Sequence, residues 1–490
     1  MKKLLLIFLL LQSFISNAQW TQVGQDLNGN TSNDVFGRSL SLSDDGSVLV
    51  IASDFNNNNS NNSGYIKVYE NISDTWVQLG SAIVGVDQGD LGVSSPVSMN
   101  ADGSIFSIGV PAYHSNGLLN SGYVRIYEYV SGNWIQIGSD IIGEVAGDRV
   151  GSSVSISDDG NIIAIGATGT TSFGFARVYE NIAGTWTQIG ADINDGSSSG
   201  SFGYSISLSN NGSIVAISNP SGGEFSKGLT RIYENIAGDW IQIGGDINGE
   251  SNSDRSGWSL DISDDGNIVA IGSIYGSNGT VDSGHVRVFE NIANVWTQIG
   301  STIGGQDDSD WFGLSLSLNN DGSIVAIGSF FHDSSRGHVR VYENQSGSWV
   351  QIDNDIDGDY VGESFGYSVS LNNSGSIMAI GARSNDDNGS NSGQVRVYTN
   401  PSVLSIVETN FGESFSIYPN PSYLHTNINL GKMYSNVSLN IFDVTGKLIS
   451  SREYQNKDSI RLDKGSLNSG IYLVKINAQD SFTTLKLIKK

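Results

Sequence analysis

Carboxylates are the most abundant side chains in this sequence that can do chemistry. The chain holds 50 Asp and Glu residues against five His and no Cys. The lack of cysteine excludes thiolate catalysis, thiolate metal sites and disulfides. Paired carboxylates hydrolyse glycosidic bonds when one acts as the acid and the other as base or nucleophile. No pair stands out among so many, and we therefore predict that the protein is not an enzyme.

Six acidic residues recur at one place in a repeated pattern, one or two residues before a Phe-Gly or equivalent dipeptide. Two roles fit this position. The carboxylates either form an acidic ring that attracts a cationic ligand, or each caps its own turn by accepting backbone N–H bonds. We favour capping. The six residues are Asp34, Asp90, Asp148, Asp254, Asp310 and Glu363.

Aromatic side chains in the non-repeating loops, which we expect to be exposed, are a second set of candidate binding residues, because such rings stack on sugars or anchor protein partners. They are Tyr113, Phe225, Tyr275, Phe330 and Phe331. Acidic clusters at 307–310 and 355–359 leave weak calcium binding open. We assign no metal, cofactor or catalytic residue.

A unit repeated along the chain must position these residues. A W-x-Q strand opens at Trp20, Trp76, Trp134, Trp186, Trp240, Trp296 and Trp349. Between successive tryptophans come an F-G-x-S strand, a D-G or N-G hairpin leading into an apolar run, and a G-x-V-R-V-Y strand. Each unit therefore has four strands.

Seven such units favour a closed ring, because radial repetition leaves few free sheet edges. The seventh unit lacks its own tryptophan strand, whereas an unpaired one, 20–24, opens the mature chain. We expect this strand to complete the seventh unit and close the ring. The predicted fold is all-β, a seven-bladed β-propeller at 19–400 followed by a small antiparallel β-sandwich; the alternative is a β-solenoid.

The propeller is expected to have two unequal faces. Short turns of nearly constant sequence make one face, while the variable loops and the long acidic loops before each F-G make the other, where recognition usually lies. Basic residues recur in the third strand at Lys67, Arg125, Arg177, Arg231, Arg287, Arg340 and Arg396. We expect these to pack along neighbouring blades rather than bind a ligand.

The two ends of the chain carry export signals. Residues 1–18 combine Lys2-Lys3, an apolar run and a small-x-small site, as in a secretory signal peptide. No later stretch is long and apolar enough to span a membrane. The formal net charge is −25, which disfavours nucleic acid and anionic membranes as partners. After Pro401 the repeat ends, and we expect a linker at 401–411.

The recurring order of F-G-x-S, the D-G hairpin, the A-I-G run and G-x-V-x-V-Y resembles the FG-GAP repeat of integrin α-like propellers. The resemblance covers about residues 20–400. Calcium-binding blades of that family carry a D-x-D-x-D-G loop. Here the turns are only Ser-Asp-Asp-Gly or similar, as at 43–46, too short to wrap an ion.

The tail at 412–490 resembles the type A C-terminal sorting domain of the type IX secretion system of Bacteroidetes-type bacteria. The matching residues are Tyr418, Pro419, Asn420, Pro421, Gly446, Gly470, Tyr472, Lys489 and Lys490. This resemblance implies contact with the type IX machinery, passage across the outer membrane, and either release or attachment to the cell surface.

The leading hypothesis is a secreted or cell-surface binding propeller, an adhesin that recognises an extracellular protein or glycan through its variable face. A secreted polysaccharide-active hydrolase or lyase is the first alternative. A structural surface-layer component is the second. The sequence does not rank the ligands.

Overall fold

The computed structural model divides the chain into two compact units, Met1–Val403 and Leu404–Lys490. The residues it describes are 19–55, 63–85, 90–91, 95–169, 173–196, 201–276, 281–400, 416–418, 425–443, 447–463, 467, 470–478 and 481–489. The expected signal peptide and linker lie outside these residues. Among the described residues, no helix has the length and apolar character needed to cross a membrane.

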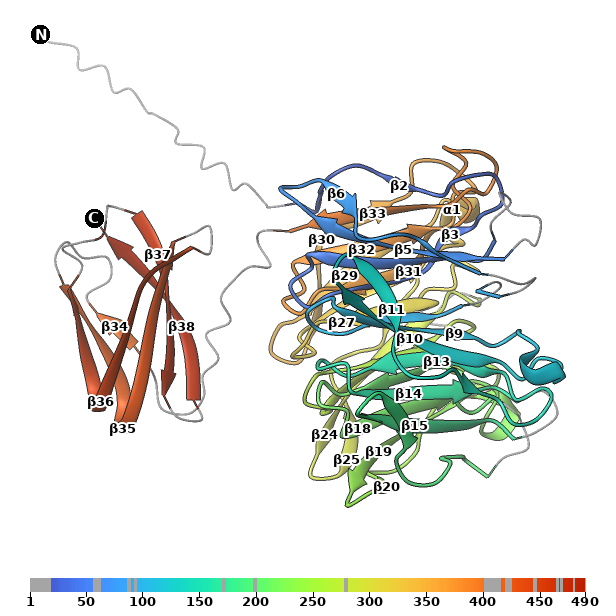
Figure 1. Ribbon diagram of the computed structural model, residues 1–490, viewed down its shortest axis with the longest axis horizontal. Coiled ribbons are helices and arrows are strands. Elements are labelled where there is room, and N and C mark those ends of the chain that lie inside the picture. The colour runs from blue at the N-terminus through green and yellow to red at the C-terminus, as the bar shows by residue number, and fades with distance from the viewer. Residues whose placement is uncertain are drawn as a thin grey trace, which may run out of the picture. The chain divides into compact units, whose positions relative to one another are not determined.

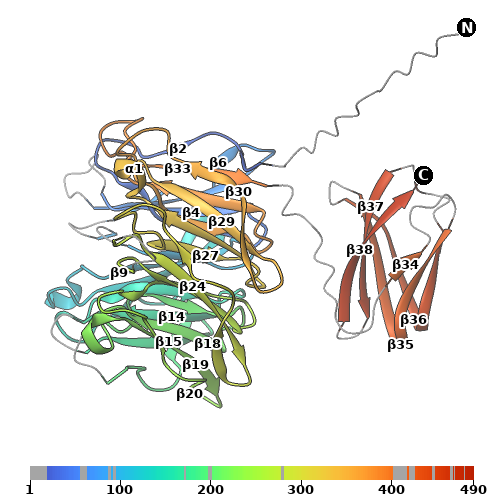
Figure 2. The ribbon, with the colours of Figure 1, turned by 180° about the vertical axis from the view of Figure 1, so that it is seen from behind.

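Seven antiparallel sheets make up the described part of the first unit, and Figures 1 and 2 show them from opposite sides. The first strands are β3 (Phe36–Leu42), β8 (Val97–Met99), β13 (Val150–Ile156), β17 (Ile206–Leu208), β22 (Ser256–Ile262), β27 (Ser315–Leu318) and β31 (Phe365–Leu371). The second strands are β4 (Val48–Ser53), β9 (Ile105–Val110), β14 (Ile162–Ala167), β18 (Ile214–Asn219), β23 (Ile268–Ser273), β28 (Ile324–Ser329) and β32 (Ile377–Ala382).

The outer half of each sheet follows the same order. The third strands are β5 (Tyr65–Asn71), β10 (Tyr123–Val130), β15 (Phe175–Ile182), β19 (Leu229–Ile236), β24 (His285–Ile292), β29 (His338–Asn344) and β33 (Gln394–Thr399). The outermost strands are β6 (Trp76–Gln78), β11 (Asn133–Gln136), β16 (Thr185–Gln188), β20 (Asp239–Gln242), β25 (Val295–Gln298), β30 (Trp349–Asp357) and β1 (Thr21–Gln22). In five of these sheets a shorter strand also pairs with the third strand. These strands are β2 (Leu27–Asn28), β7 (Ile83–Val84), β12 (Ile141–Ile142), β21 (Ile247–Asn248) and β26 (Ile303–Gly304).

The sheets form a closed ring. Each first strand contacts the first strands of both neighbouring sheets, and β31 contacts β3, so the first strands surround a common axis. At one end of this axis, each hairpin turn donates a backbone N–H to the carbonyl of the next turn at 2.9 to 3.2 Å. The chain of bonds returns to its start through Asp44, Ala101, Asp158, Asn210, Asp264, Asn320, Asn373 and again Asp44. The predicted all-β propeller is confirmed.

A second ring explains the serines of the first strands. A side-chain oxygen on each first strand accepts a backbone N–H from the next sheet at 2.9 to 3.3 Å. The acceptors are Ser41, Ser98, Ser155, Ser207, Asp261, Ser317 and Ser370. Serine is therefore selected for hydrogen bonding between sheets as well as for its small size.

The second strands are buried on both faces because neighbouring sheets cover them, which fits their continuous apolar sequences. Close packing also explains the glycine of the A-I-G runs. A Cβ on Gly272 would lie 2.3 Å from the carbonyl oxygen of Gly313 in the next sheet. Glycine therefore permits the approach of the two backbones.

The N-terminal strand pairs with the last sheet of the ring. In β1, Thr21 lies opposite Thr399 of β33, and in β2, Leu27 lies opposite Val395. One sheet is thus built from both ends of the propeller sequence. Six outer tryptophans also join neighbouring sheets through indole N–H bonds, as Trp240 does to the carbonyl of Ile189 at 3.0 Å.

The second unit contains β34 (Ser416–Tyr418), β35 (His425–Asp443), β36 (Leu448–Asp463), β37 (Gly470–Ala478) and β38 (Ser481–Lys489). All described pairings are antiparallel, and β35 pairs with β34, β36 and β37. Its core includes the buried side chains of Ile428, Leu439, Ile460 and Val474. This part of the chain is therefore a separate antiparallel β-unit.

Candidate binding face and channel mouth

Strand direction places all variable loops at one end of the ring. Each first strand begins at its F-G motif or a few residues after it and runs toward the Asp-Gly type turn, and the second strand runs back. Loops between second and third strands therefore lie at the F-G end, which we call the variable face. Within the described residues, the short helical turns all occur in these loops: η1 (Ser115–Gly117), η2 (Glu224–Ser226) and α1 (His332–Ser335). In Figure 1, α1 lies at the right of the propeller.

The six recurrent carboxylates are buried in the loops that lead into the first strands. Their exposed fractions are all at or below 4%. Both oxygens of Asp34 are used, since Oδ2 accepts the N–H groups of Asn30 and Thr31 at 2.8 and 2.9 Å and Oδ1 accepts the Thr31 hydroxyl at 2.9 Å. Backbone N–H bonds of the same kind reach Asp148, Asp254, Asp310 and Glu363.

Further partners of these carboxylates lie on the third strands. The Asp90 carboxylate accepts the Tyr123 hydroxyl and pairs with Arg125, whose Nη1 lies 3.3 Å away. Likewise, Glu363 is bonded by Arg396 and by Asn385. These contacts favour the capping role and leave no solvent-facing acidic ring at these six positions.

The five predicted aromatic residues occupy different environments. Phe225 is the most exposed, at 71%, and Phe331 is 38% exposed. By contrast, Phe330 is only 4% exposed, so our expectation of an exposed ring is wrong there; it packs against Phe331, with 4.1 Å between ring centroids. Tyr113 is partly buried, edge-on to Tyr123 at 5.1 Å.

One aromatic cluster assembles around a residue that the sequence analysis did not single out. The ring centroid of Trp311 lies 5.3 Å from that of Tyr275 and 4.5 Å from that of Phe331, and both pairs meet edge-on. Tyr367 extends the cluster, 5.2 Å from Phe330, and the Arg383 guanidinium stacks 4.0 Å from the Tyr367 ring. The cluster therefore joins rings from three neighbouring sheets, with a cation at its edge.

A cavity of about 330 Å³ opens on the same face. Its lining is Arg38, Pro111, Ala112, Arg149, Ser152, Thr168 and Tyr204. Arg38 belongs to the sheet of β3 and Tyr204 precedes β17, and two other sheets separate these in the ring. A cavity that both residues line must therefore lie over the ring axis. We call it the mouth pocket.

Two repeat positions supply most of the polar lining of the mouth pocket. The x of F-G-x-S supplies Arg38, Ser152 and Tyr204. The residue before the F of that motif supplies Arg149, which has a positive φ of 57°. A positive φ recurs at the same position of other repeats, in Val35, Arg255, Trp311 and Ser364. Comparison of the side chains at these two positions across the repeats would have pointed to the pocket from sequence.

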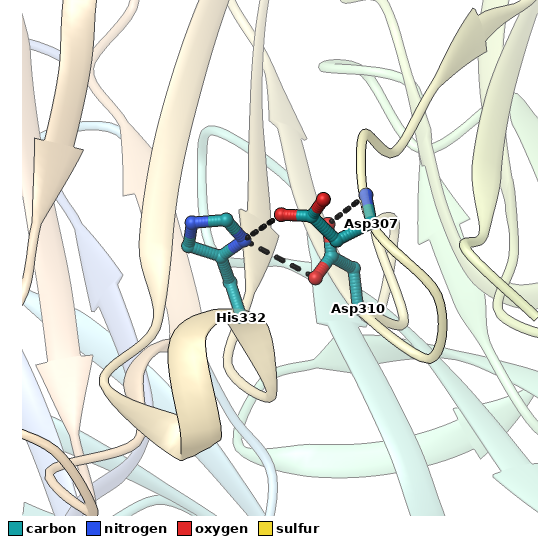
Figure 3. A group of neighbouring side chains, drawn as sticks. All are labelled: Asp307, Asp310 and His332. Carbon is teal, nitrogen blue, oxygen red and sulfur yellow. Dashed lines mark hydrogen bonds and ion pairs between the residues drawn. The ribbon is translucent and has the colours of Figure 1, made fainter. Parts of the chain in front are cut away.

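Two groups of described side chains are spaced closely enough to hold a metal ion. Figure 3 shows the first, in which His332 Nδ1 faces Asp310 at 3.1 Å and Asp307 at 3.6 Å. One imidazole with two carboxylates is a donor set that Zn²⁺ accepts. Here Asp310 already bonds the ring and the Asp307 N–H at 3.0 Å, and we assign no metal.

The second group contains His338, Asp355 and Asp357. Burial, together with the charge of the neighbouring Arg340, lowers the pKa of His338 to about 3. Arg340 also pairs with Asp355 at 3.0 Å, and its cation therefore occupies the surroundings that a metal ion would need. This group fits a structural role between the third and outermost strands of its sheet.

The basic residues of the third strands serve mainly structural contacts. Arg177 pairs with Asp192 at 2.7 Å, and Arg231 pairs with Asp246 at 2.8 Å. Each carboxylate also accepts a bond from the glutamine of the W-x-Q strand. Guanidinium groups such as that of Arg125 also stack over an aromatic ring of the same strand. These repeated contacts give no sign of a ligand site.

Comparisons with known proteins match two parts of the chain. Residues 416–490 match the secretion system C-terminal sorting domain, and residues 357–398, which include β31 to β33, match the FG-GAP repeat. The chain carries both domain types. The sorting domain indicates export by the type IX system to the outer surface or the medium. Among the predicted sorting residues, Tyr418 lies in β34, Gly470 and Tyr472 in β37, and Lys489 in β38, while Pro419, Asn420, Pro421, Gly446 and Lys490 lie outside the described residues.

Among the solved structures that resemble this chain are two with low sequence identity. One is a proposed 6-phosphogluconolactonase from Bacteroides fragilis NCTC 9343, with 12% identity, a TM-score of 0.47, and coverage of 66% of this chain and 85% of that one. The other is a proposed 6-phosphogluconolactonase from Bacteroides uniformis ATCC 8492, with 13% identity, a TM-score of 0.47, and coverage of 66% and 86%. No curated protein matches this chain.

Proposed function

We propose that this protein is an extracellular binding protein whose propeller recognises a glycan or protein through the variable face. The sorting domain supports a place outside the cell. The observation that carries the proposal is the mouth pocket, which side chains from four sheets of the ring line. Its residues differ from repeat to repeat, unlike the turns of the opposite face.

The composition of the pocket favours binding over catalysis. Its lining, as far as the structure describes these loops, includes arginines, hydroxyl groups and one phenol, but no carboxylate and no histidine. Glycoside hydrolysis normally needs a carboxylate pair, and general acid–base catalysis needs a group that titrates near the working pH. The lining offers hydrogen-bond donors in place of such a pair.

The test is a glycan and extracellular-protein binding screen on residues 19–490, with and without calcium. Selective binding is expected, weakened by Tyr204→Ala. The matched control is Ile182→Ala, which removes an exposed apolar side chain, 55% exposed, at the constant-sequence end. Binding that both variants weaken equally would move recognition away from the pocket. Cleavage of a glycan would support an enzyme instead, and ordered self-association without any ligand would support a structural component.

A further inference from the structure

Positive charge in this acidic protein is concentrated at two places. Residues 19–400 contain 13 Lys and Arg residues against 43 Asp and Glu. Seven of the 13 belong to the third-strand positions already described. The other six are Arg38, Arg149, Lys227, Arg255, Arg336 and Arg383, and all six lie in loops or strand ends of the variable face. Among the described residues of the propeller, no Lys or Arg outside the third strands lies at the opposite end.

Four of these cations surround the ring axis. Arg38 and Arg149 line the mouth pocket. The Arg38 guanidinium also lies 5.7 Å from the Tyr367 ring, on which Arg383 stacks at 4.0 Å. The charge of Arg255 acts on Tyr204, a lining residue. The mouth is therefore ringed by arginines, although the protein as a whole is strongly negative.

The acidic residues near these arginines offset the positive charge of the mouth only in part. Asp148 and Asp254, which precede two of the arginines, are buried and accept backbone N–H groups. Asp54 pairs with Arg38 at 3.0 Å, which fixes that guanidinium in place. Arg149 is exposed and forms no ion pair with any described residue. Its guanidinium is available to a ligand.

The hydroxyl and aromatic side chains at the mouth pocket indicate which class of ligand the arginines would bind. Ser152 and Thr168 present hydroxyls that bond one another at 2.8 Å, and burial raises the pKa of the Tyr204 phenol, which therefore stays neutral and able to donate. Tyr204 also lies 4.9 Å from Trp258 in the next sheet. Aromatic faces of this kind pack on the apolar faces of sugar rings, while guanidinium groups bind carboxylate or sulfate oxygens in pairs.

We propose that the mouth pocket binds an acidic sugar unit, with Arg149 and Arg38 on its carboxylate or sulfate group and Tyr204 against its ring. The inference rests on the proposed binding function and names the ligand class. The pocket volume of about 330 Å³ lies at the lower end of the range for small-molecule sites, which suits one or two units of a polysaccharide. The mixture of hydroxyls and aromatic rings favours a sugar over an acidic peptide.

The test measures binding of residues 19–490 to a galacturonic acid hexasaccharide by titration calorimetry. Its methyl ester, which has the same rings without the charges, is the matched neutral probe, and a sulfated hexasaccharide distinguishes the two acidic groups. We expect the acid to bind and the ester to bind at least tenfold more weakly. Arg149→Gln should weaken the acid roughly tenfold to hundredfold, the effect of losing a charge-assisted hydrogen bond. Lys227→Gln, with the same loss of charge on the same face, should change it less than twofold.

Each other outcome bears on a different conclusion. Equal binding of acid and ester, unaffected by Arg149→Gln, would overturn the acidic-sugar inference and leave the binding function standing. Binding of a poly-glutamate peptide, lost in Arg149→Gln while no sugar binds, would overturn the sugar but retain the anion site. Binding of the sulfated probe alone would assign the charge to sulfate. No binding of any glycan or protein would overturn the proposed function itself.

Discussion

The hairpin turns at the constant-sequence end of the axis allow one sharp test of the electrostatics. Asp44, Asp158 and Asp264 hold the same position in alternate sheets of the first five. Burial, with the added negative charges of Asp158 and Asp44, raises the pKa of Asp264 from 3.8 to about 7. Burial likewise raises the pKa of Asp158 to about 6, with the charge of Asp44 contributing. The ionised forms of these groups therefore cost stability in the folded protein.

Replacement of Asp264 by asparagine should remove that cost. A shift of about three pKa units corresponds to roughly 4 kcal/mol, and solvent screening of a partly exposed carboxylate reduces this to about 1–2 kcal/mol. Asparagine fits the backbone, because it holds the equivalent position at Asn210, Asn320 and Asn373. Its side-chain oxygen can also accept the bond that Asn320 donates to Asp264. We therefore expect Asp264→Asn to be more stable than the natural protein at pH 8.

The pH dependence of folding stability shows whether the ionised Asp264 carboxylate is destabilising. A raised carboxyl pKa makes the folded state bind a proton more tightly than the unfolded state, so stability falls as pH rises from about 4 to about 7. Asp264→Asn should therefore gain its full advantage at pH 8 and almost none at pH 4.5. Urea unfolding followed by tryptophan fluorescence at both values measures the difference.

The neighbouring aspartate is the matched control. Hydrogen bonds from Asn267 and Ser263 outweigh the effect of burial and lower the pKa of Asp265. Asp265→Asn should therefore lose stability at pH 8, with the loss fading as pH falls through the folded pKa. A gain in Asp264→Asn that is equal at both pH values, or a loss at pH 8, would refute the reasoning.

Three further predictions concern the ring and the tail. Trp240→Phe should cost about 1 kcal/mol more than Trp20→Phe in urea unfolding, because Trp240 donates to a carbonyl of the preceding sheet whereas the buried Trp20 indole N–H has no partner among the residues that the structure describes. Equal losses of stability would contradict this. EDTA should leave the unfolding midpoint unchanged, since Asp45 and its equivalents bond Ser43 or matching groups of their own turns; a drop would reveal a structural cation. Deletion of 404–490 should abolish export to the outer surface, measured by cell fractionation, while the propeller keeps its unfolding midpoint; exported truncated protein would contradict the role of the tail.

The repeat made the fold predictable because each strand occurs many times in a fixed order. A turn, an apolar run or a tryptophan strand that is ambiguous once becomes clear when it recurs. The strand opened by Trp20 could be placed in the last sheet for the same reason, since that sheet lacked one member. The observed register repeats as well, because Arg177 lies opposite Ile165 and Arg231 lies opposite Ile217.

The pocket does not follow from the shared pattern of the repeats, because it depends on side chains that differ between them. Its lining brings Arg38, Pro111, Arg149 and Tyr204 together from four sheets, and no local pattern shows that residues more than 100 positions apart share a cavity. The sequence instead drew attention to recurrent acids such as Asp34, which the structure buries as caps. Phe330 was misjudged because a loop position does not reveal that a neighbouring ring, here Phe331, covers it.

The fold could be predicted from the shared pattern of the repeats and the pocket could not, for one physical reason. A side chain that recurs in every repeat meets the same surroundings each time, so it serves contacts common to all sheets, as the arginines of the third strands and the serines between sheets do. A ligand that sits over the axis meets one residue from each sheet at once, so recognition depends on the residues that differ between repeats. Arg149 and Tyr204 are such residues. In a propeller of this kind, departures from the repeat at axis-facing positions are therefore the better guide to the binding site.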